Sequence, residues 1–105
     1  MDKNKALSML GLARRAGKLS MGHDTALSAV MEKKAELLIF ACDTSDRLRR
    51  EFQTAMDKRG IDIPVIAADI TISEIHYSCG YKAGVIAVND KNFSTKISSL
   101  LEDEA

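Results

Sequence analysis

The sequence predicts an α/β protein: a single domain, residues 1–105, folded as a three-layer α/β/α sandwich with a mixed, largely parallel four-stranded central sheet. Three short runs, residues 37–42, 64–68 and 84–88, contain no polar side chain. Such runs are typical of strands that are covered on both faces. The segments between them carry apolar residues at helical spacing. Strands that alternate with helices indicate a sheet between two helical layers.

The start of the chain predicts a helix and a short edge strand. The helix covers residues 3–16 and ends at Gly17, and the alternating stretch 18–21 follows it. Gly11 lies inside the helix, where glycine costs about 1 kcal/mol relative to alanine, so we expect a packing reason for it. The residues expected to face inward are Ala6, Leu7, Met9, Leu10 and Ala13.

A second helix and a central strand form the middle of the chain. The helix is expected to begin after the turn at Gly22, with Asp24 or Thr25 accepting a backbone N–H bond from its first turn. The strand 37–42 then ends on Asp43. The apolar face of this helix comprises Ala26, Leu27, Val30 and Met31.

The second half of the chain continues the alternation. Residues 43–46 are expected to cap a third, amphipathic helix that runs to Arg59. Thr71 or Ser73 caps a short helix, residues 73–79, which Gly80 ends. The last helix covers residues 92–101. We see no linker, repeat or low-complexity segment.

Composition excludes several classes of protein. Hydrophobic residues make up 46% of the 105 residues and charged residues 29%, as in an ordinary globular chain rather than a disordered one. No apolar run approaches the roughly 18 residues of a membrane-spanning helix. The first residues lack the apolar segment of a signal peptide. We therefore expect a cytoplasmic protein without a membrane partner.

The cysteines and histidines do not form a recognisable metal site. Cys42 and Cys79 stand among apolar residues, so we expect reduced cysteines in the core. There is no CxxC pair, and His23 and His76 are far apart in the sequence. We expect no metal and no other cofactor.

The charge distribution is uneven although the net charge is zero. Residues 1–59 carry 12 Lys and Arg against 8 Asp and Glu, whereas residues 60–105 carry 3 against 7. This asymmetry is compatible with one face that meets an anion such as RNA phosphate. The simpler interpretation is that these charges solvate the helices.

No catalytic arrangement stands out. Asp43 follows a buried strand and resembles a phosphoacceptor position, but no adjacent acidic pair or closing lysine accompanies it, and capping of the third helix by Asp43 or Asp46 explains it better. A nucleophilic Cys42 or Cys79 requires a lowered pKa, and packing explains both residues better. The glycines match no phosphate-binding loop.

Two surfaces point to nucleic acid. The second helix begins at Gly22, and free N–H groups at a helix N-terminus attract anions. Tyr81 and Lys82 lie in the loop 80–84, where Tyr81 can stack on a base and Lys82 can meet a phosphate. Basic residues before the Gly22 turn can line it: Arg14, Arg15 and Lys18.

The order of these motifs resembles the ribosomal protein L7Ae/L30e superfamily. The resemblance rests on the run 16–22, the following helix and the segment 35–43. The opening stretch 10–18, LGLARRAGK, is similar to the bacterial YlxQ-type branch of small ribosomal-protein-like proteins. It implies an α/β/α sandwich and non-enzymatic RNA binding, typically at kink-turns. It also implies RNA contacts at the start of the second helix and in the loop before the last strand.

The chain departs from the family signature Gly-x-Asn-Glu-x-x-Lys after the glycine. Asp24 replaces the asparagine, Thr25 the glutamate and Ser28 the lysine. Asp24 cannot donate to a base edge and repels phosphate. The loss of one phosphate-facing lysine removes about one phosphate contact's share of affinity and salt dependence.

We therefore expect a non-enzymatic, ribosome-associated protein that binds structured RNA, either ribosomal RNA or a kink-turn. The 80–84 loop is expected to complete the site from the other end of the sheet, with Lys18 and Lys34 as electrostatic support. The alternative is a protein-interaction adaptor that keeps the fold and uses the arginine-rich third helix or the acidic tail, residues 102–104. Ribosomal or translation-associated proteins are possible partners, and we expect a monomer. The expected RNA-binding residues are Lys18, Gly22, His23, Asp24, Thr25, Ser28, Lys34, Tyr81 and Lys82.

Overall fold

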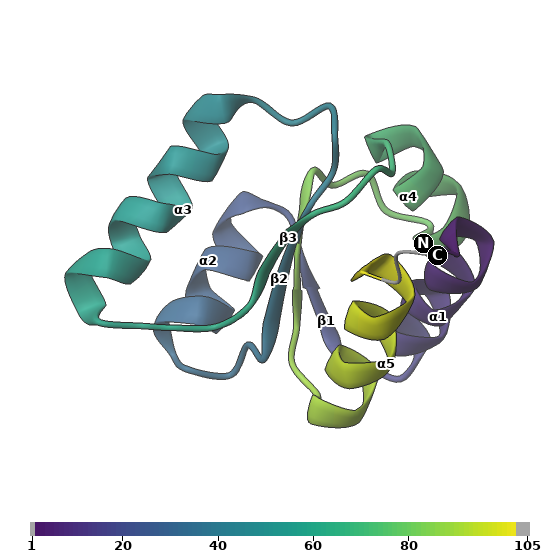
Figure 1. Cartoon of the computed structure of the whole chain (residues 1–105), viewed down its shortest axis with the longest axis horizontal. Coiled ribbons are helices and arrows are strands. Elements are labelled where there is room, and N and C mark those ends of the chain that lie inside the picture. Colours follow the sequence, from purple (N-terminus) through teal and green to yellow (C-terminus); the bar gives the residue numbers. More distant parts are fainter. Residues whose placement is uncertain (1, 103–105) are drawn as a thin grey trace.

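A computed structural model describes residues 2–102, so most of the acidic tail lies outside the described residues. The chain forms five helices and four strands within this range (Figure 1). None of these helices is long and apolar enough to cross a membrane. The elements are α1 (Lys3–Arg15), β1 (Leu19–Met21), α2 (His23–Met31), β2 (Leu37–Phe40), α3 (Asp46–Arg59), β3 (Val65–Ala67), α4 (Ile72–Cys79), β4 (Val85–Val88) and α5 (Lys91–Glu102).

The predicted three-layer sandwich is confirmed. Helices α2 and α3 cover one face of the sheet, and α1, α4 and α5 cover the other (Figure 1). The alternation along β2 shows why both layers are needed. Leu37 and Ile39 pack on the α1–α4–α5 side, and Leu38 and Phe40 pack on the α2–α3 side. All four side chains are buried, as expected for a strand that is apolar on both faces.

The sheet is mixed, but the prediction that it is largely parallel is wrong. The strand order is β1-β4-β2-β3, and only β2 and β3 pair in parallel. Strand β4 lies antiparallel to both of its neighbours, β1 and β2. The cause is the connection through α4, which returns the chain to the end of the sheet where β3 finished. Alternation of strands and helices in a sequence does not reveal such a return.

Strand β3 is less buried than its sequence predicts. It lies at the edge of the sheet, where Val65 is 43% exposed and Ala67 is also exposed. Cys42 likewise differs from the prediction, because β2 ends at Phe40 and the thiol lies in an exposed loop. Both cysteines are free, and Cys79 is half-buried. A short apolar run predicts a strand but does not say whether the strand is central or where it stops.

The helix N-termini are held in three different ways. Gly22 is the N-cap of α2, with φ 93° and no side-chain cap, so neither Asp24 nor Thr25 has the predicted role. Ser45 caps α3 by accepting a hydrogen bond from the Leu48 N–H. Thr71 caps α4, as predicted, in a reciprocal capping box with Glu74.

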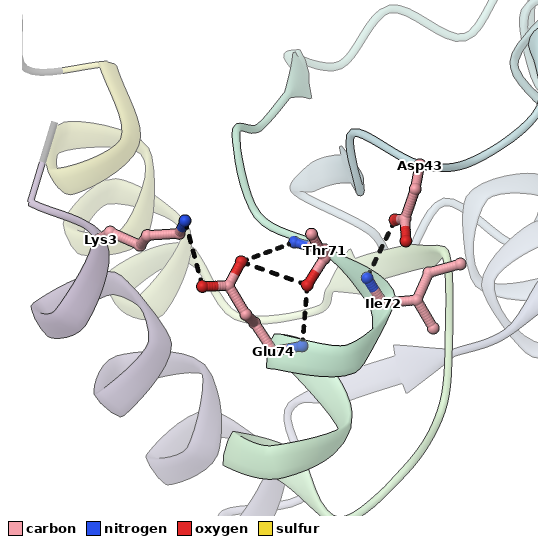
Figure 2. A network of polar contacts seen from close by, with 5 residues as sticks. All are labelled: Lys3, Asp43, Thr71, Ile72 and Glu74. Atoms are coloured by element: carbon pink, nitrogen blue, oxygen red, sulfur yellow. Dashed lines mark hydrogen bonds and ion pairs between the residues drawn. The ribbon is translucent and has the colours of Figure 1, made fainter.

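A polar network ties the start of α4 to two other parts of the chain (Figure 2). Asp43, in the β2–α3 loop, accepts a hydrogen bond of 2.9 Å from the Ile72 N–H, so its carboxylate holds α4 and does not cap α3. The Lys3 Nζ of α1 lies 3.1 Å from the Glu74 Oε2 and forms an ion pair with it. The Thr71 backbone N–H and Lys3 hold the pKa of Glu74 below its ordinary value. The network fixes the helix that leads into the 80–84 loop.

Gly11 has the packing role that its helical position predicts. A Cβ at this position would lie 2.9 Å from the backbone carbonyl oxygen of Ser78, at the end of α4. The close approach of α1 and α4 therefore depends on the missing side chain. The carbonyl belongs to the backbone, so it cannot move aside as a flexible side chain does.

We predict that Gly11→Ala destabilises the protein by about 1 kcal/mol or more, because the clash outweighs the gain in helix propensity. The measurement is the free energy of unfolding in urea. Ser8→Ala, at an exposed position of the same helix, is the control and is expected to be neutral or slightly stabilising. A Gly11→Ala protein more stable than the wild type would show that the α1–α4 contact has room for a methyl group.

Candidate nucleic-acid interface

One end of the sheet brings together three segments that are far apart in the sequence. Gly22 follows β1, the β2–α3 loop follows β2, and the 80–84 loop precedes β4. The Gly22 N–H donates to Val85 O at 3.0 Å, and the Ala41 N–H donates to Gly84 O at 2.9 Å. Because β4 runs antiparallel to its neighbours, its start lies beside their ends. The 80–84 loop therefore lies at the same end as Gly22 and not, as expected, at the other. We call this end of the sheet, with Gly22 and the start of α2, the β2–α3 loop and the 80–84 loop, the tip.

Tyr81 stands against Gly22 at the tip. A Cβ on Gly22 would lie 3.7 Å from the Tyr81 hydroxyl oxygen, so the two segments are in contact range. Arg14, from the last turn of α1, places its guanidinium carbon 5.3 Å from the centroid of the Tyr81 ring. The Arg14 Nη1 also lies 3.5 Å from the Met21 Sδ. Tyr81 remains 45% exposed, so part of its ring is available for stacking.

His23 connects the first turn of α2 to α3. Its Nδ1 lies 2.8 Å from an Asp24 carboxylate oxygen, and its Nε2 makes a short contact with Glu51 of α3. The hydrogen bonds with Asp24 and then Glu51 raise the pKa of His23 above its ordinary value. Its ring also packs edge-on against Phe52, with centroids 5.7 Å apart. A protonated His23 thus carries a positive charge between two carboxylates at the point where the second helix begins.

Arg49 fixes the β2–α3 loop, a role that the sequence does not reveal. Its Nη2 donates to Ala41 O at 3.2 Å, and its Nε donates to the Thr44 hydroxyl at 3.4 Å. Thr44 packs directly against Gly84, where a Cβ would lie 2.3 Å from the Thr44 Cγ2. In the sequence, Arg49 is one of several cations of the arginine-rich third helix, and nothing sets it apart from them. Its contacts show that it holds the β2–α3 loop, which is part of the tip, in place.

The tip gathers most, but not all, of the residues that the sequence singles out. Six residues lie there: Gly22, His23, Asp24, Thr25, Tyr81 and Lys82. Ser28 lies about 9 Å further along α2, where its hydroxyl donates to Glu32 at 2.9 Å. Lys18 precedes β1 and Lys34 follows α2, so both lie at the opposite end of the sheet. Lys18 O accepts from the Asn89 N–H there, and Lys34 pairs with Glu32 at 3.1 Å.

Two of the candidate reactive groups, Cys79 and Asp43, have surroundings that do not activate them. Burial raises the pKa of the Cys79 thiol, which disfavours the nucleophilic thiolate. The Asp43 carboxylate is engaged by a backbone N–H. Within residues 2–102, no three His, Cys, Asp or Glu side chains converge as a metal site would require. What the tip does present is an exposed aromatic ring, a helix N-terminus without a side-chain cap, and the exposed Lys82.

Comparisons with known proteins agree on one family. A model of the ribosomal protein L7Ae/L30e/S12e/Gadd45 family matches residues 4–97. A protein from Enterococcus faecium named RNA-binding protein YlxQ is 28% identical over 102 residues, covering 96% of this chain and 95% of the relative.

Two solved structures share the fold. A protein of unknown function from Bacillus halodurans superposes with a TM-score of 0.79 at 27% identity, covering 94% of this chain and 98% of that one. The Giardia lamblia 15.5kD RNA binding protein superposes with a TM-score of 0.68, covering 95% and 87%. Its 20% identity shows the fold alone.

The His23 bridge predicts a pH dependence of stability. Because the folded-state pKa is raised, the bridge contributes fully below the unfolded pKa of about 6.5 and is lost as the pH rises through the folded pKa. Glu51→Gln is therefore expected to lower the pKa of His23 and to destabilise the protein more below about pH 6 than above about pH 8.

The measurements are an NMR titration of the His23 ring and urea unfolding at the two pH values. Glu32→Gln serves as the control, because it removes a carboxylate from the opposite end of α2. Equal His23 pKa values in the wild type and in Glu51→Gln would contradict the bridge.

Proposed function

The chain belongs to the ribosomal protein L7Ae/L30e/S12e/Gadd45 family, and from this premise we propose that it is a non-enzymatic, ribosome-associated protein that binds a kink-turn or a related structured RNA through its tip. The resemblance that its motifs indicate is confirmed. A relative that carries the name RNA-binding protein along nearly the whole chain supports RNA as the ligand. The observation that carries the proposal is the exposed Tyr81 ring, held beside Gly22 with Arg14 against it.

The two parts of the tip suit different parts of an RNA. The first N–H groups of α2 have no partner within the helix, and Gly22 supplies no capping side chain, so a phosphate can take that place. The Tyr81 ring offers a flat surface to a base that has left its stack, as bases do at bends and loops. Lys82 is exposed next to it and can meet the backbone of the same strand. A bent or looped RNA satisfies both parts at once, whereas a regular duplex does not expose its bases.

The exposed carboxylate of Asp24 works against this binding, and His23 moderates it. The Asp24 side chain is 99% exposed beside the helix N-terminus, where it repels phosphate. Protonated His23, bonded to both Asp24 and Glu51, offsets part of this negative charge. Asp24 also changes which base edge can be read, because a carboxylate accepts hydrogen bonds but does not donate them. We therefore propose tighter binding at lower pH and a preference for base edges that donate.

A protein-interaction adaptor is the second candidate. The observation that favours it is an apolar groove between α1 and α5, lined by Met9, Leu12 and Leu100. Leu12 is 47% exposed there, and exposed apolar grooves are typical of protein contacts. This groove lies on the far helical layer from α2. The two functions can therefore be tested by separate variants.

We predict that Tyr81→Ala weakens binding to a kink-turn RNA by about 5- to 150-fold, the loss expected for one stacked base. Tyr77→Ala is the matched control, because Tyr77 is a fully exposed tyrosine of α4 outside the tip. The measurement is filter binding to a kink-turn RNA and to a plain duplex of equal length, titrated across salt concentration.

Kink-turn selectivity that disappears in Tyr81→Ala and survives in Tyr77→Ala would support the proposed site. If the wild type binds both RNAs equally and with a steep salt dependence, kink-turn recognition is wrong and a general phosphate surface remains. If it binds neither RNA at low salt, the adaptor becomes the better account.

A further inference from the structure

The outer face of α3 carries cations that the tip does not use. Four of them line a shallow groove between α3 and the end of α2: Arg47, Arg50, Lys58 and Arg59. They are exposed, and between residues 2 and 102 none of them forms an ion pair or a side-chain hydrogen bond. Arg49, on the same helix, is turned inward to the β2–α3 loop and so does not belong to this set. The single acidic residue of the groove, Glu51, is already engaged by His23.

The composition of the groove fits a polyanion better than a folded protein partner. Its apolar lining consists of Met31 and Ala55 alone, and it contains no aromatic residue. Protein interfaces concentrate their binding energy in Trp, Tyr and Arg anchors that are buried at the centre of the contact, whereas the arginines of this groove are exposed and no aromatic residue stands beside them. The cations from Arg47 to Arg59 extend over about 18 Å of helix. A surface of that length can contact several successive phosphates of one RNA strand.

The groove is physically continuous with the tip. Helix α3 begins at the tip end of the sheet, where its N-cap Ser45 follows the loop that Arg49 holds. The contact between His23 and Glu51 joins the first turn of α2 to the second turn of α3. From there α3 runs toward the opposite end of the sheet along the outside of the α2–α3 layer (Figure 1). An RNA bound at the tip can therefore continue along α3 without leaving the protein surface.

We propose that the α3 groove is a second phosphate-binding surface, which takes a helical arm of the same RNA that the tip binds. The inference rests on the proposed function, because it assigns the groove to that RNA. The tip recognises the unpaired or bent part, and the groove contacts the backbone of the arm without reading its sequence. Because the net charge of the chain is zero, the protein as a whole does not attract RNA, and the attraction has to come from a local cluster of cations such as this groove.

The test compares two triple variants with the same change in net charge. The groove triple is Arg47→Gln, Arg50→Gln and Lys58→Gln. The control triple is Lys5→Gln, Lys91→Gln and Lys96→Gln, which removes exposed lysines from α1 and α5 on the other helical layer. The probes are a kink-turn RNA with a short arm, and the same RNA with that arm lengthened by one helical turn. The readout is the slope of log Kd against log salt for each RNA.

On the long-arm RNA, the groove triple is expected to lower this slope by about 3, because each phosphate contact to a double helix contributes about 0.9 to it. On the short-arm RNA the change is expected to be smaller. The preference for the kink-turn over a plain duplex stays unchanged, because the tip is intact. The conservative pair Arg47→Lys and Arg50→Lys keeps the charge and is expected to keep the slope, which separates charge from any effect on the fold.

Equal slopes for the two triples on the long-arm RNA would overturn the groove proposal and leave tip recognition standing. Wild-type binding without kink-turn selectivity, but with a slope that the groove triple lowers, would refute the tip and support the groove. A groove triple that keeps its RNA slope and loses affinity for poly-L-glutamate would assign the groove to an acidic protein and overturn the proposal. No binding of the wild type to either RNA would overturn both.

Discussion

The antiparallel direction of β4 is the constraint on which the rest of this structure depends. This buried strand lies between β1 and β2, and both neighbours run the other way. Its first residues therefore meet the ends of its neighbours, through the bonds Gly22 N–H to Val85 O and Ala41 N–H to Gly84 O. If β4 ran parallel to them, the 80–84 loop would lie a full strand length away from Gly22 and the start of α2. The composite surface of glycine turn, tyrosine and arginine exists only because of this pairing.

The sequence predicts the parts of the fold that depend on local signals. Apolar residues at helical spacing, a stop such as Gly80 and the Thr71 cap are all signals within the helix itself or next to its ends. Strand direction depends on the end of the sheet at which the chain re-enters it, and no local signal reports that end. The start of α2 shows the same limit, because Gly22 is its N-cap without a side-chain hydrogen bond and neither of the neighbouring polar residues, Asp24 and Thr25, caps the helix.

The candidate site was predictable as two segments but not as one surface. In the sequence, Gly22 stands out as a turn residue and Tyr81 as an aromatic residue in a loop. Their contact follows from the pairing of β4. Lys18 and Lys34 look close to Gly22 in the sequence, but a strand on one side and a helix of nine residues on the other carry them to the far end of the sheet. Whether two residues lie at the same end of the sheet depends on the rise of the element between them, about 1.5 Å per helical residue and 3.3 Å per strand residue, rather than on how close they are in the sequence.

The cations of the chain differ in whether they already have an interaction partner within the protein. Lys3 pairs with Glu74 and Arg49 holds the β2–α3 loop, so these two charges stabilise the fold. Arg14 rests against Tyr81 and shapes the surface beside it. The arginines along the outside of α3 have no such partner among residues 2–102, and mutual repulsion along a helix is a cost that the fold itself does not need. A helix that keeps unpaired like charges on one face gains by meeting an anion. The zero net charge of the chain therefore conceals a local positive surface on α3 that is free to contact an anion.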